Sequence, residues 1–178
     1  MRVFARFFVV VSVLIALFLT ASAPAQAATR FIQLAIWPPA QLFPQQDKVH
    51  GVRLCLYGIQ QEVQGYDLGI FTRTTGKQVG LQHSIIGLVE GDFTGWQHGF
   101  VANIVKGRCV GLQTAIYNNA GDGKGVMFGF INMSRSMNGL QLSFFNYTNT
   151  LHGLQIGIVN IIQSKTDWPV LPIVNWSF

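Results

Sequence analysis

A segment of 14 to 16 residues that begins with glycine recurs along most of this chain. The copies begin at Gly51, Gly65, Gly80, Gly95, Gly111, Gly125, Gly139 and Gly153. Self-similarity at a nearly fixed period is the signature of a repeat architecture, so it constrains the fold more than any other feature of the sequence. Each copy is expected to be one structural unit that its neighbours stabilise.

Within each copy, apolar and polar residues alternate with a period of two, which predicts a β-strand. In the last copy the first, third and fifth residues after the glycine are Leu154, Ile156 and Ile158. No copy has a charged residue at these three positions. The positions between them hold mainly a glutamine and then a small residue. We therefore expect strands of about eight to ten residues, each with one apolar face and one polar face.

Two further segments, 30–37 and 170–178, have strand-like sequences without the repeat motif. They raise the expected number of strands to about ten. The longest expected connection is 38–50, and the other connections are short.

Two architectures can use such a repeat. A parallel β-solenoid would bury the leucine, isoleucine and phenylalanine side chains and stack Asn118, Asn132, Asn146 and Asn160 as a ladder. An antiparallel meander would make every second copy equivalent and could close into a barrel.

Two alternations favour the meander. Every second copy has glycine at its fourth position, namely Gly69, Gly99, Gly129 and Gly157. The segments between copies are also alternately acidic or neutral and basic, with Glu62 after the first copy and Arg73 with Lys77 after the second. In an antiparallel array these two sets of connections would lie at opposite ends of the sheet.

An open sheet with one apolar face would expose unpaired edges and a large apolar surface. Closure in a lipid bilayer removes both problems, because outer-membrane barrels are apolar outside and polar inside. The ending Asn175-Trp176-Ser177-Phe178 also resembles the assembly signal of such barrels. We therefore expect an all-β antiparallel meander of about ten short strands, closed as an outer-membrane-type β-barrel, with a β-solenoid as the alternative. The expected partners are outer-membrane lipid and the barrel-assembly machinery.

The N-terminus predicts export. Arg2 and Arg6 precede an apolar run at 7–19, and Ala25-Gln26-Ala27 offers the small residues of a cleavage site. The expected organisation is a signal peptide at 1–27 and a single β-repeat domain at 28–178. The expected location is the outer membrane or cell surface, or else the periplasm or the medium. In such an oxidising compartment a disulfide between Cys55 and Cys109 is conceivable.

Three parts of the chain together resemble a family of bacterial surface-repeat proteins. They are the repeats such as Gly153-Leu154-Gln155-Ile156-Gly157, the segment Trp37-Pro38-Pro39-Ala40-Gln41-Leu42-Phe43-Pro44 and the ending Pro172-Ile173-Val174-Asn175-Trp176-Ser177-Phe178. The resemblance covers nearly all of the mature chain and implies an exported, surface-associated protein without a settled activity. The first two copies depart from the pattern, with Arg53 and Asp67 in place of glutamine, and a later copy has Met127.

The candidate binding residues lie on the polar face, at the second position of the copies: Arg53, Asp67, Gln82, Gln97, Gln113, Gln141 and Gln155. Arg53 and Asp67 would either charge the interior of a pore or form a buried ion pair between neighbouring strands, and the ion pair is favoured. The glutamines would line a narrow channel, bind a small polar ligand or, as we favour, hydrogen-bond to one another.

Enzyme motifs are missing from the sequence, and its seven acidic residues leave few candidates for acid–base chemistry. His83 and His98 are expected to lie opposite each other, but zinc normally needs a third protein ligand, so no metal or other cofactor is expected. Basic patches interleaved with aromatic residues are missing too, which argues against nucleic acid. The expected function is a structural or narrow-pore role without catalysis. The alternative is a secreted β-repeat protein that binds a partner or small polar ligand through its glutamine-rich face, and a small soluble enzyme is a distant third.

Overall fold

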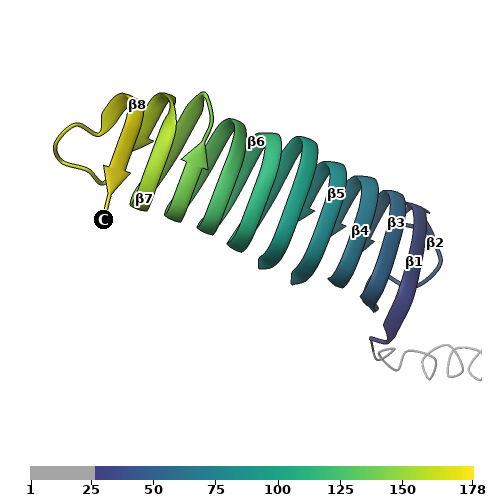
Figure 1. Ribbon diagram of the computed structural model, residues 1–178. Helices are drawn as coiled ribbons and strands as arrows, with labels where there is room; N and C mark the ends of the chain where they lie inside the picture. Colours follow the sequence, from purple (N-terminus) through teal and green to yellow (C-terminus); the bar gives the residue numbers. More distant parts are fainter. Residues whose placement is uncertain (1–26) are drawn as a thin grey trace, which may run out of the picture.

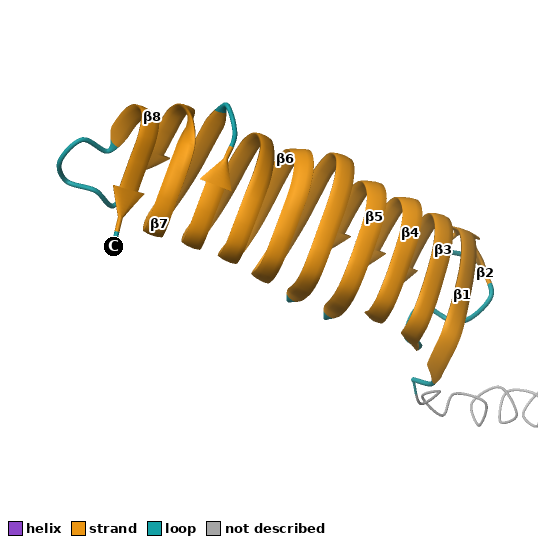
Figure 2. Ribbon diagram, viewed as in Figure 1, coloured by secondary structure: helices purple, strands orange, loops and turns teal. Residues whose placement is uncertain are grey.

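The chain forms a β-solenoid, whose turns stack along one axis from β1 to β8 (Figures 1 and 2). The computed structural model describes residues 27–178, so nearly all of the predicted signal peptide lies outside the described residues. The strands are β1 Thr29–Trp37, β2 Ala40–Gln41, β3 Lys48–Gln60, β4 Glu62–Thr74, β5 Gln78–Val89, β6 Phe93–Leu142, β7 Phe145–Ile162 and β8 Val170–Ser177. Strand β6 is long because it winds through several turns without interruption.

Consecutive turns pair in parallel, with equivalent residues side by side. Gly51 pairs with Gly65, and Gly65 pairs with Gly80. The same register relates Gly139 to Gly153 across β6 and β7. Each position of the repeat therefore forms a column along the solenoid, in which like residues are about 4.8 Å apart.

The repeat glycine is required by the backbone. All eight repeat glycines have a positive φ, between 118° and 156°, a region that other residues rarely adopt. A Cβ atom on Gly125 would lie 2.1 Å from the carbonyl oxygen of Gly111. The repeat glycines after Gly51 all make this close approach to the glycine of the preceding turn, so no larger residue fits.

The expected closed barrel is wrong, and the alternative, a β-solenoid, is the fold observed. Much of each segment that was expected to be a short connection is itself strand. Residues 57–60, for example, pair in parallel with 71–74 of the next turn. The chain therefore turns a corner and continues in the same rotational sense, where a meander would reverse its direction.

The interior has a polar part and an apolar part. The polar part consists of the inward side chains at the second position and of a column of asparagines. The apolar part is a cluster that includes Val89, Phe93, Val105, Met137 and Ile162. The leucine, isoleucine and phenylalanine residues that a solenoid was expected to bury lie outside, which is the side that the barrel interpretation assigned to them.

Each end of the solenoid is closed differently. At the N-terminal end the loop after β2 is tied down by Gln33, whose side chain accepts from Phe43 N at 3.0 Å and donates to Phe43 O at 2.8 Å. At the C-terminal end β8 runs antiparallel to β7. Pro172 lies within β8, and a proline in an edge strand limits pairing with a further strand.

We expect Gly125→Ala to lower the free energy of unfolding by at least about 1–3 kcal/mol, because alanine must adopt a strained φ and displace the backbone of the preceding turn. Urea unfolding followed by circular dichroism measures the change. The neighbouring exposed substitution Lys124→Ala is the control, with an expected effect within about 0.5 kcal/mol. Equal stability of the two variants would contradict the role assigned to the glycine column.

Candidate functional site

Arg53 and Asp67 form a buried ion pair between β3 and β4. Both side chains are 0% exposed, and the guanidinium donates from Nε and Nη2 to the two carboxylate oxygens at 2.7 and 2.6 Å. Burial alone would lower the pKa of the Arg53 guanidinium, but the charge and hydrogen bonds of Asp67 raise this pKa overall above its ordinary value. The pair therefore stays ionised and links two turns, as the favoured interpretation of the sequence predicts.

The glutamines continue this column along the solenoid. Gln82 Nε2 donates to Asp67 at 3.1 Å, Gln97 donates to Gln82 at 2.6 Å, and Gln113 donates to Gln97 at 2.8 Å. Each amide donates toward the N-terminal end, so the bonds form one chain with a single direction. Hydrogen-bonded chains of this kind satisfy polar groups that would be costly to bury alone.

Met127 interrupts the column. It occupies the second position of its copy, between Gln113 and Gln141. A thioether has no N–H to donate, and Gln113 Oε1 is buried without a hydrogen-bond partner among the described residues. On the other side Gln141 Nε2 contacts the Met127 sulfur at 3.6 Å, a weak acceptor. Gln155 then resumes the pattern by donating to Gln141 at 2.8 Å.

A second polar column consists of asparagines at the corner after the apolar positions. Asn103, Asn118, Asn132 and Asn146 each donate to the next asparagine, the last bond ending on Asn160. Asn118 also donates to Phe128 O at 2.9 Å, so its amide binds the backbone of the following turn. The sequence indicated this ladder only for the solenoid alternative and did not place it among the candidate sites.

All seven candidate binding residues therefore face inward. Arg53, Asp67, Gln97, Gln141 and Gln155 are 0% exposed, and Gln82 and Gln113 are almost as deeply buried. Their polar atoms bind mainly one another and neighbouring backbone. In this fold they cannot contact a partner at the surface, and their role is to hold the turns together.

The surface that remains for binding is an apolar face on the outside. It consists of the first, third and fifth residues of the copies: Val52, Leu54, Leu56, Tyr66, Leu68, Ile70, Leu81, His83, Ile85, Trp96, His98, Phe100, Leu112, Thr114, Ile116, Val126, Phe128, Phe130, Leu140, Leu142, Phe144, Leu154, Ile156 and Ile158. In register with them are Ile32 and Leu34 of β1 and Val174 and Trp176 of β8.

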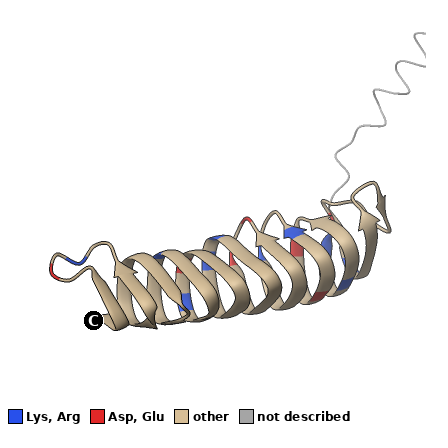
Figure 3. Ribbon diagram, turned by 90° about the horizontal axis from the view of Figure 1, so that it is seen from above, with Lys and Arg blue, Asp and Glu red and all other residues tan. Residues whose placement is uncertain are grey.

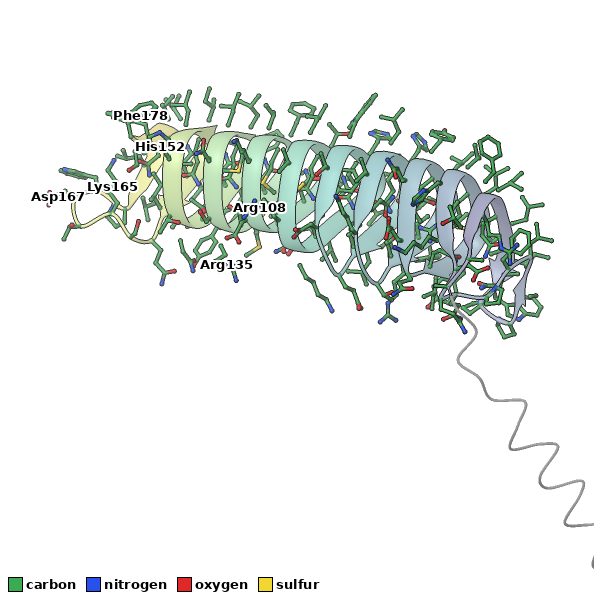
Figure 4. All side chains as sticks on the ribbon, turned by 90° about the horizontal axis from the view of Figure 1, so that it is seen from below. Arg108, Arg135, His152, Lys165, Asp167 and Phe178 are labelled. Atoms are coloured by element: carbon green, nitrogen blue, oxygen red, sulfur yellow. The ribbon has the colours of Figure 1, made fainter. Side chains whose placement is uncertain are left out.

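This apolar face is well exposed along its whole length. Phe100, Phe128 and Ile158 are 69%, 57% and 63% exposed. Figure 4 shows the carbon-rich side chains projecting along one long edge of the solenoid, with the labelled Arg135 on the opposite edge. Contiguous exposed apolar areas above a few hundred Å² mark interaction surfaces.

Shallow grooves lie in the apolar face, mainly between its third-position and fifth-position columns. One of about 790 Å³ is lined by residues of β1, β3 and β4 that include Leu34 and Ile70. A second of about 540 Å³ lies between Phe128, Phe144 and Ile158, and a third of about 350 Å³ lies beside Phe100 and Ile116. Such grooves can accept the side chains of an opposing surface.

One polar cluster interrupts the apolar face. The imidazoles of His83 and His98 are stacked on adjacent strands, with ring centroids 4.8 Å apart. Thr114 Oγ1 lies 2.7 Å from His98 Nδ1 and accepts from Trp96 Nε1 at 3.1 Å. Burial, together with the charge of His83, lowers the pKa of His98 below its usual value. The predicted proximity of the histidines is therefore confirmed. The two residues are neighbours because the turns stack in parallel, whereas in the expected meander a hairpin would have brought them together.

The charged residues form ion pairs between consecutive turns. Lys48 pairs with Glu62 at 3.0 Å, and Arg135 pairs with Asp122 at 2.7 Å. Glu90 lies between Arg73 and Lys106, at 2.7 and 3.5 Å, and the hydrogen bond from Arg73 lowers its pKa. Figure 3 shows residues of both signs interspersed along the solenoid. The alternation of acidic and basic segments, which favoured a meander, therefore brings opposite charges together on neighbouring turns.

The disulfide that the sequence left open does not form, since Cys55 and Cys109 are both free. They belong to different columns on turns far apart along the solenoid. Burial raises the pKa of the Cys55 thiol to about 11 and that of Cys109 to about 12. Both thiols are therefore protonated and unreactive at neutral pH.

Comparison with protein-family models, with curated proteins and with solved structures finds no match to this chain. Within residues 27–178, no helix is long and apolar enough to span a membrane. The same residues contain no group of three or more histidine, cysteine or acidic side chains arranged to hold a metal ion.

We expect Asp67→Gln to lower the free energy of unfolding by about 3–5 kcal/mol, because it leaves the Arg53 charge buried without a counter-ion. The double variant Arg53→Gln/Asp67→Gln should recover most of this loss, since it extends the glutamine column already present in later turns. Urea unfolding of both variants measures the difference. If the single variant were as stable as the double one, the ion pair would not have the role described.

We expect Met127→Gln to raise the free energy of unfolding by about 1 kcal/mol, because a glutamine there can donate to Gln113 and accept from Gln141. Thermal unfolding measures the gain. Met127→Leu is the matched control, because it keeps an apolar side chain of similar volume without an amide. A glutamine variant no more stable than the leucine variant would contradict a continuous hydrogen-bonded column.

Proposed function

We propose that this protein is an exported, non-catalytic binding protein and that its binding surface is the apolar face. The observation on which this depends is the inversion of the fold, with polar columns inside and a charge-free apolar surface along the whole outside of one side. Exposing such a surface to water is unfavourable, and covering it releases free energy of about 25 cal/mol per Å². The sequence suggested the glutamine-rich face for binding, but that face is buried. We therefore propose the exposed apolar face as the binding surface.

The absence of catalysis is part of the proposal. Three kinds of group with catalytic potential are engaged or inactivated in the fold. The charge of Asp67 is balanced by Arg53 in a buried ion pair. The thiols of Cys55 and Cys109 are buried and protonated. The imidazole of His98 contacts the hydroxyl of Thr114 and the imidazole of His83. General acid–base catalysis needs a titratable group within reach of substrate and tuned to its task.

Export and surface location rest on the sequence. The predicted signal peptide and the resemblance to bacterial surface-repeat proteins both support a position outside the cytoplasm. The terminal Phe178, which the sequence suggested as an assembly signal, is 85% exposed and lies edge-on to His152 at a ring-centroid distance of 6.1 Å (Figure 4). We propose the cell envelope as the compartment in which the apolar face meets its partner.

We expect the double variant Phe128→Asp/Ile158→Asp, made in the full chain with its own leader, to release the protein from whatever covers the apolar face. The two carboxylates would have to be desolvated at any apolar contact. Cell fractionation followed by native gel electrophoresis should find the wild type in membranes or in a particle larger than one chain. The variant should migrate as a single chain outside membranes.

Thr150→Asp is the control, because it adds a carboxylate at an exposed position outside the apolar face. Circular dichroism verifies that all variants are folded. A wild type that migrates as a single chain outside membranes, or a double variant distributed like the wild type, would contradict binding through the apolar face.

A further inference from the structure

The size of the apolar face matches what a stable dimer buries. It extends over β1, the eight repeat segments and β8, which at a strand spacing of about 4.8 Å is roughly 43 Å. From first to fifth position it is about 13 Å wide, at roughly 3.3 Å per residue. Each chain therefore offers roughly 560 Å², and two chains face to face would bury roughly 1,100 Å², close to the lower bound of about 1,200 Å² for standard interfaces.

The polar cluster lies at the centre of this face. His83, His98 and Thr114 are the third-position residues of three consecutive middle copies, those that begin at Gly80, Gly95 and Gly111. In the other copies this position is apolar: Leu54, Leu68, Phe128, Leu142 and Ile156. The third position is also the middle of the three outward columns. The cluster is thus central both along the solenoid and across it.

A two-fold axis explains this placement. In a face-to-face dimer the axis lies in the plane of the interface, and an axis through the centre of the face brings the cluster of one copy against the same cluster of the other. The imidazoles and hydroxyls would then meet hydrogen-bonding groups. Hydrocarbon offers none, and burying unpaired polar groups there costs free energy. We infer that a second copy of this chain covers the apolar face, packed about a two-fold axis through the His83–His98–Thr114 cluster.

This inference rests on the proposed function, because it names the partner of the same surface. Other features fit it. The apolar face contains no charge to repel its copy, and the grooves beside Phe100 and Phe128 can accept side chains from an opposing sheet. The charged Arg135 lies on the opposite edge, away from the contact.

The dimer would be sensitive to acid. His83 stacks between Leu68 and His98, and His98 is flanked by Thr114 on the next turn and Trp96 on its own strand. None of these neighbours is an acid that could balance an imidazolium. Burial lowers the pKa of His98 already in one chain. The dimer is therefore complete above the ordinary imidazole pKa of about 6.5 and is lost as the pH falls from there through the lower pKa of His98.

Sedimentation equilibrium of the purified mature chain tests the inference. We expect a dimer at pH 8 and a dissociation constant raised by on the order of 100-fold at pH 5. Phe128→Asp should give monomers at pH 8, with Thr150→Asp as the dimeric control. His83→Leu/His98→Leu places at both positions the leucine that other repeats have there, as at Leu54, Leu68 and Leu142, and should remain dimeric at pH 5. Circular dichroism confirms folding of each variant.

Co-flotation with phosphatidylcholine–phosphatidylglycerol vesicles distinguishes a failure of the dimer inference from a failure of the proposed function. Monomers at pH 8 that float with vesicles, and lose this property with Phe128→Asp, would overturn the dimer and leave the proposed function in place. Monomers that neither float nor respond to Phe128→Asp would overturn both. A dimer unaffected by Phe128→Asp would place the contact elsewhere and also overturn the inference.

Discussion

The close stacking of the repeat glycines is the constraint on which the rest of this structure depends. Each carbonyl oxygen approaches the glycine of the next turn so closely that a Cβ atom has no space, and the positive φ bends the chain at the same point in every turn. Once the glycines are in register, most other positions of the repeat stack on their equivalents. Like side chains then lie about 4.8 Å apart, and a residue is acceptable only if it tolerates a copy of itself or a suitable partner at that distance.

Amide side chains meet this condition inside the solenoid. A carboxamide donates to the copy on one side and accepts from the copy on the other, so a column such as Gln82, Gln97 and Gln113 is satisfied except at its ends. Within the two columns the unpaired oxygens lie where a column ends or is interrupted: Gln113 Oε1 faces Met127, and Asn103 Oδ1 begins the asparagine ladder. The buried amides thereby satisfy one another's hydrogen bonds. The apolar residues at the first, third and fifth positions of the repeat are left on the surface. The covering partner that we propose is a consequence of this arrangement of the interior.

The charged residues show the same rule on the surface. Like charges stacked at every turn would repel, so the sign alternates and Glu90 lies between Arg73 and Lys106. The fourth position alternates for a steric reason, since a Cβ on Gly69 would lie 2.6 Å from the Cys55 sulfur. Both alternations have a period of two turns. In the sequence this period favoured an antiparallel unit of two strands, although stacking of parallel turns produces it equally well.

The repeat, the strands, the residues that share each face and two residue pairings can all be read from the sequence. The pairings are those of Arg53 with Asp67 and of His83 with His98. These follow from spacing, because residues at equivalent positions of adjacent copies become neighbours in either architecture. The sequence also indicated, through the barrel interpretation, that the polar residues face inward. That the chain winds in parallel is seen only in the folded protein. Alternation with a period of two is the same whichever way the next strand runs, and the direction depends on whether segments such as 57–60 form turns or, as observed, a further side of the coil.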